Sequence, residues 1–178
     1  MSKKLFACLF ASISINAGAL PAKVEIKSIV EFFSFTCSHC ANVNYKLNQF
    51  VAMHNIKFLD VNIDNSPEAL NTTIMYYIAI DAGVGGTFKD AYFKAISTGL
   101  PAYSKTTLDY VLTQLNDSKI ARLIHSKEEQ QKIKLKLKYA QDLINTYNIR
   151  ATPTFLINQT TVLEGEEVLN SLIGADND

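Results

Sequence analysis

The sequence has few cysteines and no excess of charge of either sign, and both shortages exclude classes of protein. Three cysteines among 178 residues are too few for a small domain held together by several disulfides. Basic and acidic residues number 17 each, so no basic surface indicates binding to nucleic acid or to an anionic membrane. With only seven glycines and four prolines, the chain has no flexible linker, and we expect a single globular domain.

An apolar stretch stands near the start of the chain. Two lysines, Lys3 and Lys4, precede the apolar run from Leu5 to Ile15, and small residues follow at Ala17-Gly18-Ala19. This order is typical of a cleavable signal peptide, and the run is shorter than the roughly 20 residues that a membrane-spanning helix needs. We therefore predict a signal peptide at residues 1–22 and export from the cytoplasm. The alternative is an apolar first helix or a retained anchor.

Only two cysteines remain once this segment is removed. Cys8 lies inside the apolar run, which leaves Cys37 and Cys40 in the mature chain. A disulfide across so short a loop removes little entropy from the unfolded chain and would stabilise the fold only slightly. The pair is therefore expected to have a chemical role.

Hydrophobic periodicity predicts an α/β domain at residues 23–178. Strands are predicted at Lys27–Phe35, Ile56–Ile63, Pro153–Ile157 and Thr161–Glu164. Helices are predicted at Cys40–His54, Ala69–Asp81, Phe88–Ser97, Thr106–Asn116, Ser126–Tyr147 and Glu166–Ile173. Gly83, Gly85 and Gly86 are predicted to end the second of these helices. The order is βαβ, then a helical insertion at about 67–147, then ββα.

The motif Cys37-Ser38-His39-Cys40 lies where the first predicted strand meets the first predicted helix. Disulfide exchange requires a thiolate, and the unpaired N–H groups and dipole at a helix N-terminus stabilise that anion. We therefore predict that Cys37 is the attacking thiol and that Cys40, one turn later, is the resolving thiol. A protonated His39 would stabilise the thiolate further and make the disulfide a stronger oxidant.

Two other roles for the cysteine pair, zinc binding and a purely structural disulfide, have weaker support. A zinc site requires four ligands, and only His39, His54 and His125 remain to complete one, without suitable spacing. A purely structural disulfide is disfavoured by the short loop. We therefore expect no metal at this site.

Two segments resemble one family. Glu31-Phe32-Phe33-Ser34-Phe35, followed after one residue by Cys-x-His-Cys, resembles the active-site segment of the DsbA family of bacterial thiol:disulfide interchange proteins, in the thioredoxin superfamily. Ile149 to Asn158 (IRATPTFLIN) resembles the cis-proline segment of that family. The resemblance implies a thioredoxin fold with an inserted helical subdomain, and a periplasmic enzyme that introduces disulfides into exported proteins.

The same resemblance implies cofactor and partners. No cofactor is expected beyond the redox-active disulfide itself. Expected partners are exported proteins with free cysteines and a quinone-linked membrane oxidase that re-oxidises the pair. We expect a monomer because no dimerisation segment is recognisable.

Two residues depart from the family pattern and favour a second hypothesis. Ser38 stands where the family usually has proline, and Thr152 before Pro153 is more typical of disulfide reductases and isomerases. A reductase or isomerase of the same fold is therefore the alternative. A third hypothesis is a non-catalytic chaperone that binds peptides with the same fold.

Three further residues are candidates for the site. With the family resemblance, we predict a cis bond at Pro153, which would turn the backbone of Thr152 toward an extended substrate. The alternative is a trans proline that simply begins a strand. Glu31 lies in an apolar strand six residues before Cys37. Because a buried carboxylate is costly without a task or a partner, we predict that it accepts the proton of Cys40 with a raised pKa. The alternative places Glu31 on an outward-facing strand edge.

Overall fold

The computed structural model describes residues 25–174, and the predicted signal peptide at 1–22 lies outside them. The strands are β1 (Ser28–Phe33), β2 (Lys57–Asn62), β3 (Thr154–Ile157) and β4 (Thr161–Glu164). The helices are α1 (Ser38–Met53), α2 (Pro67–Ala82), α3 (Gly85–Ser97), α4 (Lys105–Leu115), α5 (Ser118–Ile124), α6 (Lys127–Thr146) and α7 (Glu167–Gly174). The predicted order of strands and helices is confirmed.

The four strands form one mixed sheet in the order β2-β1-β3-β4. Strand β1 pairs in parallel with β2, as the crossover through α1 requires, and antiparallel with β3, which pairs antiparallel with β4. β1 is therefore flanked on both sides and buried along almost its whole length. Residues on this strand cannot lie at a sheet edge.

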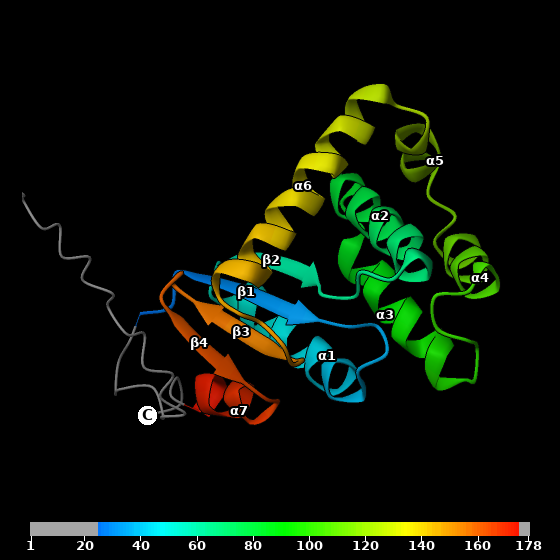
Figure 1. Ribbon diagram of the computed structural model, residues 1–178. Helices are drawn as coiled ribbons and strands as arrows, with labels where there is room; N and C mark the ends of the chain where they lie inside the picture. The colour runs from blue at the N-terminus through cyan, green and yellow to red at the C-terminus, as the bar shows by residue number, and fades with distance from the viewer. Residues whose placement is uncertain (1–24, 175–178) are drawn as a thin grey trace, which may run out of the picture.

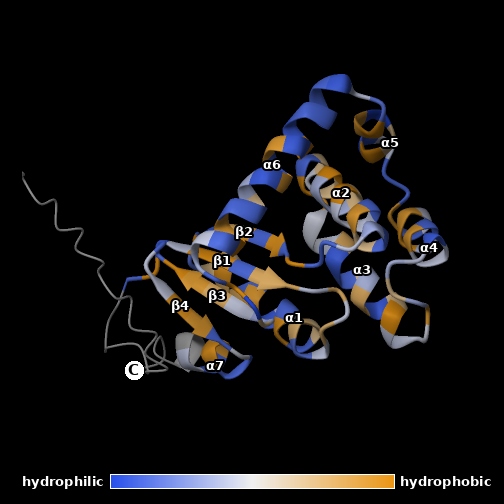
Figure 2. Cartoon of the chain, viewed as in Figure 1, coloured by the Kyte–Doolittle hydropathy of each residue, from blue (hydrophilic) through white to orange (hydrophobic). Residues whose placement is uncertain are grey.

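Helices cover both faces of the sheet (Figure 1). On one face, Val43, Leu47 and Phe50 of α1 pack with Leu169 of α7 against alternate residues of β1 and β3. On the other face, α6 and the segment after it contribute Ala140 and Ile149, among other residues. The strands are predominantly apolar, whereas α6 is polar along much of its surface (Figure 2). This distribution fits a sheet covered on both sides and a helix with one exposed face.

Helices α2 to α5 form a group beside the sheet, and α6 leads from that group back to it (Figure 1). Side-chain oxygens of Ser66, Ser104, Asp117 and Ser126 accept backbone N–H bonds at the starts of α2, α4, α5 and α6. Such N-caps satisfy N–H groups that have no partner within the helix. Within the described residues, no helix is long and apolar enough to cross a membrane.

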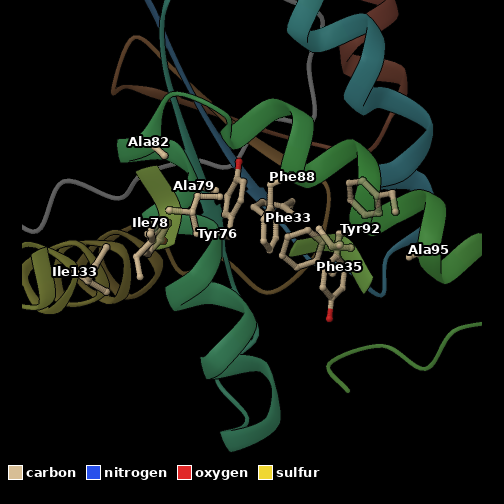
Figure 3. Packing of buried hydrophobic residues seen from close by; sticks show 14 of the residues in the cluster. Phe33, Phe35, Tyr76, Ile78, Ala79, Ala82, Phe88, Tyr92, Ala95 and Ile133 are labelled. Carbon is tan, nitrogen blue, oxygen red and sulfur yellow. The ribbon is translucent and has the colours of Figure 1, made fainter. Parts of the chain in front are cut away.

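Aromatic side chains join this helical group to the end of β1. Figure 3 shows the rings of Phe33 and Phe35 beside those of Tyr76, Phe88 and Tyr92. The centroids of Phe35 and Tyr92 are 4.4 Å apart, and those of Phe33 and Phe35 are 5.0 Å apart in an edge-to-face arrangement. Because Cys40 belongs to the same buried cluster, the insertion packs directly behind the cysteine motif.

The connection between α2 and α3 differs from the prediction. Gly83, at φ 90°, ends α2 as predicted, but Gly85 and Gly86 lie in the first turn of α3. A Cβ atom at Gly85 would lie 2.5 Å from Cγ1 of Ile80. This glycine therefore allows close packing of two helices rather than ending one. Helix α5 has no predicted counterpart, because seven residues are too few to show a helical period.

Candidate active site

Cys37 occupies the N-cap of α1. Its Sγ accepts a hydrogen bond from the backbone N of Cys40 at 3.1 Å, and its own N–H donates to the carbonyl of Ser34 at 3.1 Å. The half-buried thiol donates to the carbonyl oxygen of Thr152 at 3.4 Å. The N–H group directed at Sγ can stabilise a negative charge there, so the position suits a nucleophilic thiolate.

Cys40, in the first turn of α1, is inaccessible to solvent, with an exposed fraction of 0%. Burial raises the pKa of the Cys40 thiol well above its ordinary value, and the hydrogen bond with Cys37 adds to the effect. Since burial disfavours its charged form, Cys40 keeps its proton in the dithiol state. The two thiols are therefore chemically unequal, with Cys37 available to a partner and Cys40 protected.

The predicted cis-proline loop lies against the pair. The peptide bond between Thr152 and Pro153 is cis, as predicted. Pro153 is buried, Thr152 is half-buried, and the carbonyl of Pro153 accepts a bond from the N–H of Gly165 at 2.9 Å. The loop thus connects the cysteine motif to the turn after β4, although these segments are more than 100 residues apart.

His39 does not stand alone at the rim of the site. Its Nδ1 lies 3.0 Å from Oε2 of Glu166, in the turn before α7. Asn42 donates to the same oxygen at 3.3 Å. These hydrogen bonds lower the pKa of Glu166, that from His39 most. The side chain of His39 is 63% exposed, so the contact lies in solvent beside the motif.

Glu31 is fully buried on the central strand, which rules out the alternative of an outward-facing edge position. Lys89 of α3 places its Nζ 2.6 Å from Oε2 of Glu31 and 2.8 Å from Oδ1 of Asp60. Asp60 is the in-register neighbour of Glu31 on β2 and accepts a short hydrogen bond from the hydroxyl of Tyr76. We call Glu31, Asp60, Tyr76 and Lys89 the buried charge cluster.

One cation in this cluster faces two carboxylates. Burial raises the pKa of Glu31 to about 8, with Lys89 opposing the shift and Asp60 adding to it. Burial alone would lower the pKa of Lys89, but the two carboxylates raise it to about 12. Lys89 and Asp60 form a buried ion pair, and Glu31, whose pKa is about 8, largely retains a proton at neutral pH. The charge of Glu31 also contributes to the raised pKa of Cys40, so the two groups interact.

Several residues at the site were not predicted from sequence. Lys89, Asp60 and Glu166 meet the predicted residues only through tertiary contacts. The sequence pattern could have indicated the burial of Lys89, because this residue is spaced three and four residues from Tyr92 and Phe93 on the buried face of its helix. No group of three or more potential metal ligands occurs in residues 25–174 that could hold a metal ion.

Comparison with known proteins places the fold. A family model described as "Thioredoxin" matches residues 14–174. The structure of a DsbA variant from Pseudomonas aeruginosa is 19% identical, with a TM-score of 0.67, and the match covers 90% of this chain and 89% of that one.

Two further solved structures agree. The oxidoreductase NmDsbA1 from N. meningitidis is 19% identical over 90% of this chain and 88% of its own, with a TM-score of 0.63. A DsbA disulfide interchange protein from Klebsiella pneumoniae is 20% identical over 90% and 95%, with a TM-score of 0.62. No curated protein matches the chain. The predicted thioredoxin fold with an inserted helical subdomain is confirmed.

Proposed function

Because the chain belongs to the thioredoxin family, we propose that it is a thiol:disulfide oxidoreductase that introduces disulfides into exported proteins through Cys37 and Cys40. The observation that carries this proposal is the inequality of the two thiols. Cys37 is half-buried at a helix N-cap beside the carbonyl of Thr152, whereas Cys40 is fully buried. The DsbA-like fold supports the same reaction class.

The proposed reaction starts from the oxidised pair. A substrate thiolate attacks Sγ of Cys37, the Cys37–Cys40 bond breaks, and Cys40 leaves and takes up a proton. A second substrate thiolate then attacks the substrate sulfur of the mixed disulfide and releases Cys37 as a thiolate. The substrate loses two electrons and two protons. The cysteine pair gains both electrons and one proton, on Cys40, and the other proton goes to solvent. The N-cap position of Cys37 favours its release in the last step.

Thr152 and Pro153 are proposed to hold the substrate. The carbonyl of Thr152 already lies 3.4 Å from Sγ of Cys37. An extended substrate that paired with this backbone would bring its cysteine to the same sulfur.

Glu31 is proposed to exchange the proton of Cys40. When the pair is re-oxidised, Cys40 must lose its proton to attack a mixed disulfide on Cys37. Glu31 is a buried group whose pKa of about 8 lies near physiological pH, a value suited to proton transfer. A rise in pH through about 8 should therefore ionise Glu31 and accelerate re-oxidation.

The cellular setting belongs to the proposal. A signal peptide would deliver the domain to the periplasm, where exported proteins present free cysteines. A quinone-linked membrane oxidase is proposed to re-oxidise the pair, so that no separate cofactor is needed. His39 is proposed to stabilise the Cys37 thiolate, and the protein is proposed to act as a monomer.

A reductase or isomerase of the same fold is the second candidate. The contact between His39 and Glu166 favours it, because a carboxylate beside the imidazole offsets the positive charge that would stabilise the thiolate. A less stabilised thiolate makes the disulfide a weaker oxidant. Ser38 and Thr152 favour the same direction.

The test is the redox equilibrium of the mature protein with glutathione, followed by oxidation of a reduced substrate protein. A potential near about −120 mV is expected for an oxidase, and one near about −270 mV would reverse the proposed electron flow. Cys37→Ser should abolish exchange. Cys40→Ser, the matched control, should form a mixed disulfide with oxidised glutathione and fail to resolve it. Full activity in Cys37→Ser would overturn the assignment.

A further inference from the structure

A second polar cluster lies directly before the cysteine motif. Ser34, the first residue after β1, donates from Oγ to Oδ2 of Asp64 at 2.5 Å. The hydroxyl of Tyr103 donates to the same carboxylate oxygen through a short hydrogen bond. These three residues come from the β1–α1 loop, the β2–α2 loop and the α3–α4 loop. We call Ser34, Asp64 and Tyr103 the loop clamp.

The loop clamp reaches the backbone of the motif. The Tyr103 hydroxyl accepts a bond from the N–H of Phe35 at 3.2 Å, and Oγ of Ser34 accepts one from the N–H of Thr36 at 3.0 Å. The carbonyl of Ser34 accepts the N–H of Cys37 at 3.1 Å. The backbone N–H groups of Phe35, Thr36 and Cys37, the three residues before α1, therefore all donate hydrogen bonds to members of the loop clamp.

Tyr103 and Asp64 of the loop clamp are themselves held in place by further hydrogen bonds. The backbone N–H of Tyr103 donates to the hydroxyl of the buried Tyr92 at 3.1 Å. The N–H of Asp64 donates to Oδ1 of Asn62 at 3.1 Å, and Asn62 donates to Thr73 of α2 at 2.9 Å. The clamp therefore anchors the cysteine loop to α2 and α3 of the helical insertion.

Tyr103 adopts a backbone conformation that such a role would explain. Its φ is 57°, a left-handed value that is uncommon for a bulky side chain. Burial, and then the neighbouring carboxylate of Asp64, raise the pKa of Tyr103 above its ordinary value. The hydroxyl therefore keeps its proton and remains a donor to Asp64.

We infer that Tyr103 and Asp64 are positioning residues that hold the Ser34–Cys37 loop so that the sulfur of Cys37 stays at the N-cap of α1. This inference rests on the proposed exchange at Cys37. The sulfur of the reduced form depends on non-covalent contacts to stay beside the N–H of Cys40. In the oxidised form, the bond to Cys40 holds the same sulfur covalently. The clamp therefore stabilises the reduced pair more than the disulfide.

Tyr103→Phe tests this inference, because it removes the hydroxyl and keeps the ring that packs edge-on to Phe35. The equilibrium with glutathione should shift toward the disulfide by a factor of about two to ten, the range expected for one lost hydrogen bond. Asp64→Asn should shift it in the same direction. Tyr110→Phe, at an exposed tyrosine of α4, is the matched control and should leave the equilibrium unchanged.

The outcomes separate the clamp from a purely structural role. Thermal unfolding of each variant is measured alongside the equilibrium. A lower melting temperature with an unchanged equilibrium in both Tyr103→Phe and Asp64→Asn would overturn the inference, as would a shift toward the dithiol. Failure of the unmodified protein to equilibrate with glutathione would instead contradict the proposed function.

Discussion

The buried charge cluster and the loop clamp both connect the helical insertion to the sheet, yet their surroundings differ. In the first, the side chains of Lys89 and Glu31 are 1% and 0% exposed. In the second, Asp64 and Tyr103 are only half-buried. The first joins a cation to two carboxylates, whereas the second joins one carboxylate to two neutral hydroxyls.

This difference in burial predicts a difference in role. Removing one partner from a buried ion pair leaves a charge without water or counter-ion, which costs several kcal/mol. A half-buried hydroxyl that loses its partner can bond to water instead. We therefore expect the buried charge cluster to determine stability and protonation, and the loop clamp to determine the geometry of Cys37. The contact between His39 and Glu166 is largely exposed to solvent. It adds a third case to the comparison, the one with the least burial.

The largest effect is expected for Lys89→Met. This change leaves Glu31 and Asp60 buried without their cation, and we expect the free energy of unfolding to fall by about 3–5 kcal/mol. Urea unfolding measures it. Lys94→Met, on an exposed position of the same helix, is the matched control and should cost far less. If Lys89→Met lowered the free energy of unfolding no more than Lys94→Met, the buried charge cluster would not have the stabilising role that the comparison assigns to it.

A second effect, visible as a pH dependence, is expected for Glu31→Gln. The pKa of Glu31 is raised from 4.5 to about 8 on folding, so the folded state holds a proton that the unfolded state has lost. Its contribution to stability is complete below about pH 4.5 and is lost as pH rises through 8, with a slope on the order of 1 kcal/mol per pH unit. The stability advantage of the unmodified protein over Glu31→Gln should therefore shrink over this range.

Urea unfolding of both proteins at pH 5, 6.5 and 8 checks the sign of this change. The rate of re-oxidation, followed in parallel, should rise with pH in the unmodified protein and rise less steeply in Glu31→Gln, where only the ionisation of the thiols remains. A stability difference that stays constant from pH 5 to pH 8 would show that Glu31 does not retain its proton on folding.

The smallest effect is expected for Glu166→Gln at the exposed rim. Exposed ion pairs contribute little to stability because water and salt screen them, so no measurable change in unfolding is expected. In the unmodified protein, the hydrogen bond from His39 lowers the pKa of Glu166. His39→Ala should therefore raise that pKa, which NMR titration of the carboxyl group measures. A clear loss of stability in Glu166→Gln would show that the contribution of these contacts to stability does not follow their exposure to solvent.

Local patterns were sufficient for most of the fold. The strand at Thr161–Glu164 was predicted with the bounds that the structure has, and the other strands and six of the seven helices were predicted with small differences at their ends. Apolar spacing, serine caps and glycine ends are properties of neighbouring residues, so they can be read without knowledge of the fold. The errors at Gly85 and α5 arose where packing between helices or short length outweighed the local pattern.

Parts of the candidate site were accessible from sequence for the same reason. Cys37, His39 and Cys40 lie within four residues, and their position between a strand and a helix indicates the chemistry of the pair. Pro153 could be placed only by resemblance to a family segment, because proline alone does not predict a cis bond.

The sequence by itself determined the order of strands and helices, the position of the cysteine motif at the start of a helix, and the presence of an unusual carboxylate at Glu31. Only the tertiary structure decided which side chains surround that motif. Lys89 lies 58 residues from Glu31, and Tyr103 lies 69 residues from Ser34. Such contacts depend on how the helices pack against the sheet. A pattern of neighbouring residues carries no information about which residues, far apart in the sequence, will meet in the fold.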